Sequence, residues 1–228
     1  MRAQARIFQG GMGFAAVVAF AVWAFQILPP ELSGQDYVQI ARKASEGRAI
    51  PPAELSAARA AFDRALPDMG CRADLLRAGA TIDIADPALL ADNPAIERAE
   101  RLFRQSLACA PLQGNLWLVL ARLQAQRGGP PAETLRLLEK SHDLAPREEW
   151  IAVRRLAFEA NLDLDLPQAS EGRLNEMIHD MVRGVSWRQL VDIYNSSGVR
   201  GRQRILRAVE AATMMQQQRF YFHVLWRR

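Results

Sequence analysis

The stretch Trp117-Leu-Val-Leu-Ala-Arg-Leu123 recurs thirty-three residues later as Trp150-Ile-Ala-Val-Arg-Arg-Leu156. The residues before each copy recur as well, since 102–111 reads LFRQSLACAP and 137–146 reads LLEKSHDLAP. A helical sequence that repeats at this period predicts stacked helix pairs, because one pair cannot bury its apolar face alone. Such a stack usually provides a surface for binding other molecules, and we expect the same of this chain.

The composition favours helix along the whole chain. Hydrophobic residues make up 50% of the 228 residues and aromatic residues only 7%. Apolar residues recur at three- and four-residue steps, which predicts an all-α fold. Helices are expected at 34–46, 51–66, 71–84, 95–110, 115–127, 132–144, 148–161, 171–182, 187–194 and 200–218, with a loop at 86–94.

The N-terminal region predicts a single transmembrane helix. No charged residue occurs between Ile7 and Pro30. As a helix, residues 7–28 extend roughly 33 Å, which matches a hydrocarbon core of roughly 30 Å. Arg2 and Arg6 precede this segment and Glu31 follows it, so the positive-inside rule predicts a cytoplasmic N-terminus. We expect a bacterial inner-membrane protein with most of its chain in the periplasm.

A cleaved signal peptide is the alternative to a retained anchor. Val22-Trp23-Ala24 has the small residues of a cleavage site after a short apolar region. The apolar run continues past that site through Ile27 and Leu28, which favours the anchor. Both interpretations place the bulk of the chain outside the cytoplasm. The expected segments are a cytoplasmic tail (1–6), an anchor (7–29), a helical cap region (30–94), repeats (95–161) and Arg-rich C-terminal helices (162–228).

The chain contains two cysteines, Cys71 and Cys109, in separate predicted helices. An exported compartment permits a disulfide between them. Two small buried thiols are a slightly better explanation on sequence alone, because nothing in it brings the two Cα atoms together.

The repeated segment resembles the tetratricopeptide repeat (TPR) family. Trp117-x-x-Leu120-Ala121 fits the start of the family pattern, and Ala99-x-x-x-Phe103 with Pro111 fits its second half. Leu138 and Pro146 repeat that second half one unit later. Gln124 and Ala157 replace the usual Tyr, and Arg154 replaces the usual Gly. The resemblance covers about two units, 95–161, so the flanking helices are expected to cap the stack.

The resemblance implies that the first helix of each pair lines a concave binding face. The residues expected there are Asn115, Leu118, Arg122, Glu148, Ile151, Arg155 and Phe158. Arg122 and Arg155 would then bind a carboxylate or an acidic segment of a partner. In the alternative, these arginines pair with Glu148 and Glu159 and are structural. Trp117 and Trp150 are interpreted as packing anchors.

The C-terminal region is basic and ends in aromatic residues. The only acidic residues in 183–228 are Asp192 and Glu210. A partner protein or an anionic membrane would contact Arg219, Phe220, Tyr221, Phe222 and Trp226. The alternative is a terminal helix whose aromatic side chains pack on the preceding helices. Export argues against nucleic acid as the ligand.

No sequence pattern predicts catalysis. Glu139-x-x-His142 and Glu176-x-x-His179 supply only half of a di-iron ligand set, and His142 is expected at the exposed end of its helix. No nucleophile elbow and no phosphate-binding loop occurs in the sequence. We expect no catalytic residue, metal, cofactor or small-molecule ligand.

The sequence therefore predicts a non-catalytic scaffold or accessory subunit of a bacterial envelope complex. The pathways that use membrane-anchored TPR proteins of this layout include translocation, cytochrome maturation, and polysaccharide export or assembly. Its partners are expected to be envelope proteins, with the lipid bilayer around 7–29. The alternative is a structural subunit of a larger membrane enzyme or transporter, held by its anchor helix.

Overall fold

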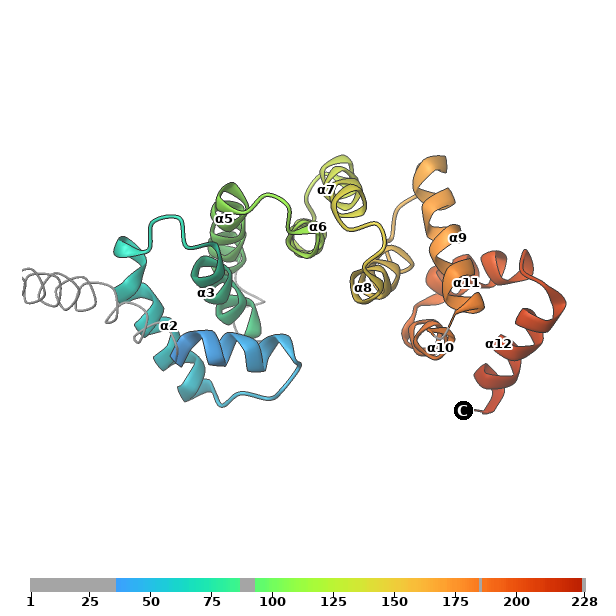
Figure 1. The fold of residues 1–228 in the computed structure, drawn as a ribbon, viewed down its shortest axis with the longest axis horizontal. Helices are drawn as coiled ribbons and strands as arrows, with labels where there is room; N and C mark the ends of the chain where they lie inside the picture. The colour runs from blue at the N-terminus through green and yellow to red at the C-terminus, as the bar shows by residue number, and fades with distance from the viewer. Residues whose placement is uncertain (1–35, 87–92, 185, 227–228) are drawn as a thin grey trace, which may run out of the picture. The chain divides into compact units, whose positions relative to one another are not determined.

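The computed structural model describes residues 36–86, 93–184 and 186–226. These residues are all-helical, with no strand among them. The predicted anchor at 7–29 lies outside the described residues. No helix within the described part of the chain is both long and apolar enough to cross a bilayer. The chain forms two compact units, one up to Pro111 and one from Leu112 (Figure 1).

The first unit contains a helix at 36–45, then α2 (Pro52–Ala65), the short 3₁₀ helix η1 (Leu66–Asp68), α3 (Ala73–Ala85) and α5 (Asn93–Cys109). Proline opens α2, where its missing N–H costs nothing. α3 packs along α5 and against α2. The rings of Tyr37 and Phe62 meet edge to face at 5.6 Å, and both side chains are buried. This core holds the cap region and the first predicted repeat helix together.

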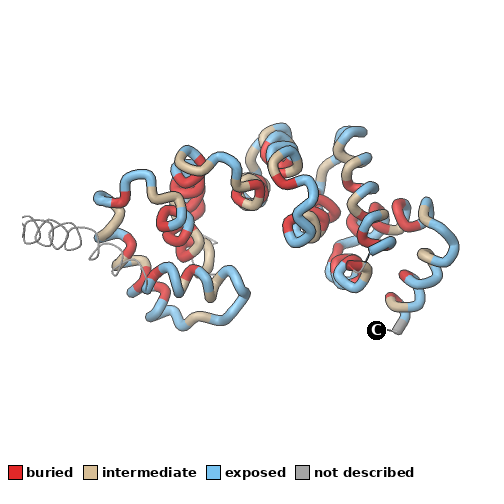
Figure 2. The backbone as a smooth tube through the Cα atoms, viewed as in Figure 1, coloured by how far each residue is buried: buried red, intermediate tan, exposed pale blue. Residues whose placement is uncertain are grey.

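The second unit contains α6 (Gly114–Gln126), α7 (Pro131–Leu144), α8 (Glu149–Glu159), α9 (Gln168–Arg183), α10 (Trp187–Ser196), α11 (Val199–Glu210) and α12 (Met214–Trp226). α6 packs along α7, and α8 contacts both α6 and α9. α10, α11 and α12 contact one another and α9. Buried residues gather on the facing sides of these helices (Figure 2). Each of these helices thus turns apolar residues toward its neighbours in the second unit.

The predicted long helix at 200–218 is wrong, because the chain forms two helices there. α11 ends at Glu210 and α12 begins at Met214. The backbone N–H and the hydroxyl of Thr213 both donate to Oε1 of Gln216, at 3.1 and 3.0 Å. Nε2 of Gln217 donates to the backbone carbonyl of Glu210 at 2.8 Å. The Thr-x-x-Gln pattern is that of a capping box, which satisfies donors at a new helix start.

Candidate functional site

Three of the seven residues predicted for the concave face are buried in the second unit. Leu118 on α6 and Ile151 and Arg155 on α8 are buried, with Arg155 at 0% exposure. Asn115 and Phe158 are half-buried, and only Arg122 and Glu148 are exposed. The prediction that Arg155 lines an open groove together with Arg122 is therefore wrong. Apolar side chains on this side of α6 and α8 serve the core of the second unit.

Arg155 instead completes the end of α7. Its Nη1 donates to the carbonyl of Ser141 and its Nη2 to the carbonyl of Ala145, each at 2.8 Å. The carbonyl of Ser141 also accepts the backbone N–H of Ala145 at 3.1 Å, so the guanidinium adds a second donor there. At Ala145 it supplies a donor beyond the end of the helix, where carbonyls have no partner within the helix. Burial lowers the pKa of Arg155, while the carboxylates of Glu159 and Glu148 raise it. The structural alternative is correct for Arg155, although carbonyls rather than carboxylates accept its hydrogen bonds.

The prediction that His142 lies at the exposed end of its helix is wrong. Its side chain is 12% exposed, and its Nε2 lies 2.8 Å from Oε1 of the buried Glu159. The adjoining pocket, which Glu139 and Arg173 also line, has a volume of about 10 Å³. This is close to the minimum for one water molecule. The imidazole therefore serves the contact between α7 and α8.

The histidine of the second Glu/His pair is also engaged by the chain itself. Nε2 of His179 donates to the carbonyl of Ala208 at 2.9 Å and links α9 to α11. In the described ranges, no three His, Cys, Asp or Glu side chains gather as a metal-ligand group.

A small pocket lies between α9 and α11, with a volume of about 130 Å³ and Glu171, His179, Arg204 and Arg207 in its wall. Nη1 of Arg204 donates to the backbone carbonyls of Glu159 and Leu162 at 3.1 and 2.8 Å. Burial lowers the pKa of Arg204. Because its donors serve the loop after α8, this arginine is a structural residue rather than an anion receptor.

The interpretation of Trp150 as a packing anchor is wrong. The side chain is 53% exposed, and the guanidinium of Arg154 lies 5.7 Å from its ring centroid. The buried face of α8 passes through Ile151, Arg155 and Glu159, and Trp150 lies beside this face. The equivalent Trp117 is half-buried on α6. The sequence repeat therefore does not give the two tryptophans the same environment.

The structure separates the predicted C-terminal contact residues. Phe220 is 3% exposed and meets the ring of Tyr194 on α10 edge to face at 5.5 Å, so it packs α12 onto the unit. Tyr221 and Phe222 are exposed on the other side of α12. The side chain of Trp226 lies outside the described residues. The packing interpretation is therefore confirmed for Phe220. The contact interpretation stays a prediction for the exposed Tyr221 and Phe222.

Trp187 of α10 organises a cationic cluster beside α12 that sequence reasoning missed. His223 stacks on its ring at 3.9 Å. The guanidinium groups of Arg219 and Arg188 lie 4.9 and 5.2 Å from the same ring. An arginine over an indole is attracted by the negative face of the ring, by about 0.5–1 kcal/mol at exposed sites. The i, i+4 spacing of Arg219 and His223 was the available sequence signal.

The outer face of α12 carries a row of exposed apolar side chains. Its members are 37–79% exposed and are Met214, Met215, Tyr221, Phe222 and Leu225. Their positions i, i+1, i+7, i+8 and i+11 share one side of a helix. We call these five residues the α12 stripe. Together with the cluster around Trp187, it is the candidate functional surface of the second unit.

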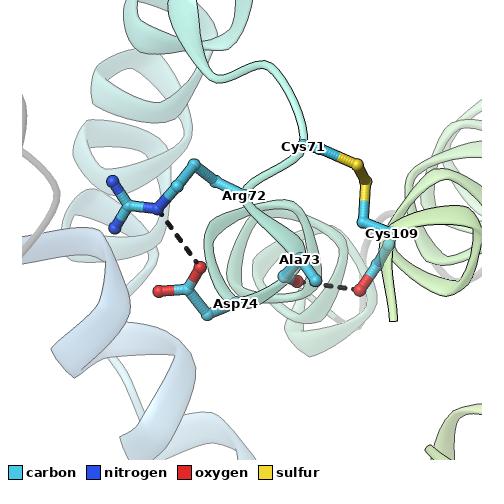
Figure 3. The surroundings of a disulfide bond; sticks show 6 residues. Cys71, Arg72, Ala73, Asp74 and Cys109 are labelled. Carbon is cyan, nitrogen blue, oxygen red and sulfur yellow. Dashed lines mark hydrogen bonds and ion pairs between the residues drawn. A yellow bond between two sulfur atoms is a disulfide. The ribbon is translucent and has the colours of Figure 1, made fainter. Parts of the chain in front are cut away.

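A disulfide joins Cys71 to Cys109 in the first unit, with a Cα–Cα distance of 5.4 Å (Figure 3). The slight preference for two buried thiols is wrong, and so is the helical placement of Cys71. This residue is exposed and precedes α3, whereas Cys109 ends α5. The hydroxyl of Ser106 donates to the carbonyl of Ala73 at 2.8 Å beside the bond. Two contacts therefore tie the start of α3 to the end of α5.

Comparison with known proteins adds no family to this description. No protein-family model, no curated protein and no solved structure matches the chain. The resemblance of 95–161 to TPR proteins therefore rests on its own residues.

Proposed function

We propose that this chain is a non-catalytic, membrane-anchored scaffold of a bacterial envelope complex, with a TPR-like helical region in the periplasm. The observation that carries the proposal is the disulfide between Cys71 and Cys109. Structural disulfides persist in oxidising compartments such as the periplasm and are rare in the cytosol. The uncharged apolar segment 7–29 supplies the anchor in this proposal.

The binding role is supported by how the side chains are used. His142 and His179 are each engaged by the chain's own groups, which supports a packing role for both. The exposed apolar side chains instead concentrate on the α12 stripe, next to two arginines. Exposed apolar patches that are rimmed by polar residues mark interaction sites. The pairing of α6 with α7 supports the TPR-like assignment.

A second candidate function is a structural subunit whose anchor packs inside a larger membrane enzyme. The observation that favours it is the row of small residues Gly10, Gly11, Gly13, Ala15 and Ala16. Small residues allow close helix packing in a membrane. Replacing 7–29 with an unrelated membrane helix distinguishes the two, because a scaffold keeps its partners and an integral subunit loses them.

Affinity purification from native membranes tests the proposed function. A mild detergent extract of cells that express the tagged full chain is expected to yield a stoichiometric complex with other envelope proteins. Thiol alkylation before and after reduction is expected to label the cysteines only after reduction. A monomeric chain with freely alkylated thiols would contradict the proposal.

A further inference from the structure

α12 is apolar on two opposite sides, and among the described residues only one of these sides packs on the unit. Phe220 and Val224 point into the unit and are buried at 3% and 7% exposure. The α12 stripe lies on the other side, where Met214, Met215 and Leu225 are 69–79% exposed. A surface helix normally turns its apolar face to the core and its polar face to solvent, so a second apolar side in solvent is unusual. Burying one large apolar side chain fully is worth about 1.5–3 kcal/mol, so the uncovered side favours a partner.

The form of the stripe favours a protein helix over a lipid surface. Gln218 is exposed and occupies position i+4 from Met214, in the middle of the stripe. An amide at the centre of the buried face would lose its hydrogen bonds in lipid, which is costly. In a helix–helix seam, one polar residue among apolar ones fixes the register. Methionine side chains at the start of the stripe adapt to the shape of a partner.

The charge beside the stripe specifies the partner further. Arg219 follows Gln218 on α12, and Arg188 shares the ring of Trp187 with it. Residues 214–226 contain no Asp or Glu, so a second copy of this helix would offer no complementary charge. Complementary charges at an interface rim raise specificity and the association rate.

We propose that the α12 stripe docks an amphipathic helix of a partner protein, whose apolar face covers the stripe and whose flanking Asp or Glu residues meet Arg188 and Arg219. This proposal rests on the scaffold function and names the chemistry of its partner. Apolar anchors at helical spacing determine affinity in this binding mode. The rim arginines determine which helix is accepted.

Site-specific photo-crosslinking in native membranes tests the proposal. A photoreactive residue replaces Met215, Phe222 or Leu225 in the full chain, and replaces the exposed Gln203 of α11 as the control. The three stripe positions are expected to form adducts with one protein segment, and the control is not. Peptide mass spectrometry is expected to show apolar residues at i, i+3 or i+4 and i+7, with acidic flanks. The additional substitution Arg219→Glu is expected to lower the adduct yield about tenfold.

Four results would overturn the proposal. They are adducts with lipid, adducts with a second copy of the chain, equal yields at the stripe and at Gln203, and no adducts at any stripe position. Affinity purification separates this failure from failure of the scaffold function. If a stable complex is recovered while the stripe forms no adduct with it, the scaffold function stands and the docking proposal falls.

Discussion

Asp83 on α3 accepts a 2.9 Å hydrogen bond from Nε of Arg59 on α2. Its second oxygen lies 3.4 Å from Nε of Arg98 on α5, so one carboxylate links three helices of the first unit. Asp83 is 3% exposed. Burial raises its pKa, and the two arginines oppose that effect only in part.

This pKa shift predicts how stability depends on pH. A carboxyl group whose pKa is higher in the folded chain than in the unfolded chain stabilises the fold fully only below its unfolded pKa, about 3.9. This stabilisation is lost as the pH rises through the pKa of the folded chain. The free energy of unfolding of the wild type, minus that of Asp83→Asn, is therefore expected to fall as the pH rises from about 3.5 towards neutral. Urea titrations across this range measure the difference. A difference that grows with pH would show that the arginines outweigh burial.

Removal of the disulfide is expected to destabilise the first unit. The bond closes a loop between residues 38 positions apart. Loop-closure entropy then predicts a loss of roughly 4 kcal/mol for the double variant Cys71→Ser/Cys109→Ser. Denaturant unfolding with and without a reducing agent measures this loss. The wild type is expected to weaken on reduction, whereas the double variant stays unchanged, and equal stability of the two oxidised proteins would refute the prediction.

Two helical glycines are expected to respond to alanine in opposite directions. A Cβ at Gly79 on α3 would collide with the ring of Phe62 on α2. Overpacking of this kind costs about 1–3 kcal/mol, so Gly79→Ala is expected to destabilise the chain. A Cβ at Gly172 on α9 would meet no atom within 4 Å. Gly172→Ala is expected to stabilise by up to about 1 kcal/mol, because alanine favours helix. Thermal unfolding of both variants measures the contrast, and a stable Gly79→Ala variant would contradict the packing.

Alanine substitutions at two neighbouring arginines of α8 are expected to lower the free energy of unfolding by very different amounts. Arg155→Ala removes the donors to the buried carbonyls of Ser141 and Ala145. A buried polar group that loses its hydrogen-bond partner costs about 1–3 kcal/mol, so Arg155→Ala is expected to cost at least this much. The matched control, Arg154→Ala, removes an exposed contact with Trp150 and is expected to cost less than about 1 kcal/mol. Denaturant unfolding compares the two. If Arg155→Ala kept full stability but lost a bound partner, Arg155 would belong to a groove after all.

The helices were predicted well where apolar periodicity was strong. The prediction at 95–110 corresponds to α5, Asn93–Cys109, and the prediction at 132–144 corresponds to α7, Pro131–Leu144. Prolines and glycines marked most of the ends, because their backbones cannot continue a helix without cost. The break between α11 and α12 was missed, although Thr213 and Gln216 have the spacing of a capping box. Apolar periodicity runs through such a break and does not reveal it.

The candidate surface was predicted only in part. Phe222 and Tyr221 are exposed on the outer side of α12, as a contact surface requires, whereas Phe220 one position earlier is buried. A run of consecutive aromatic residues does not indicate which of them pack against the rest of the unit. For Trp187, which lies against the arginines beside the stripe, the sequence predicts only the start of a helix.

The sequence by itself determined that the described part of the chain is helical and where most of its helices lie, because propensity and periodicity are local properties. Only the tertiary structure decided what individual side chains do. The matching positions Arg122 and Arg155 differ in this way: the first is exposed, whereas the second is buried against the carbonyls of α7. Cys71 and Cys109 meet because α3 packs along α5. Burial and pairing depend on contacts with residues that are distant in the sequence, and a local sequence pattern does not reveal those contacts.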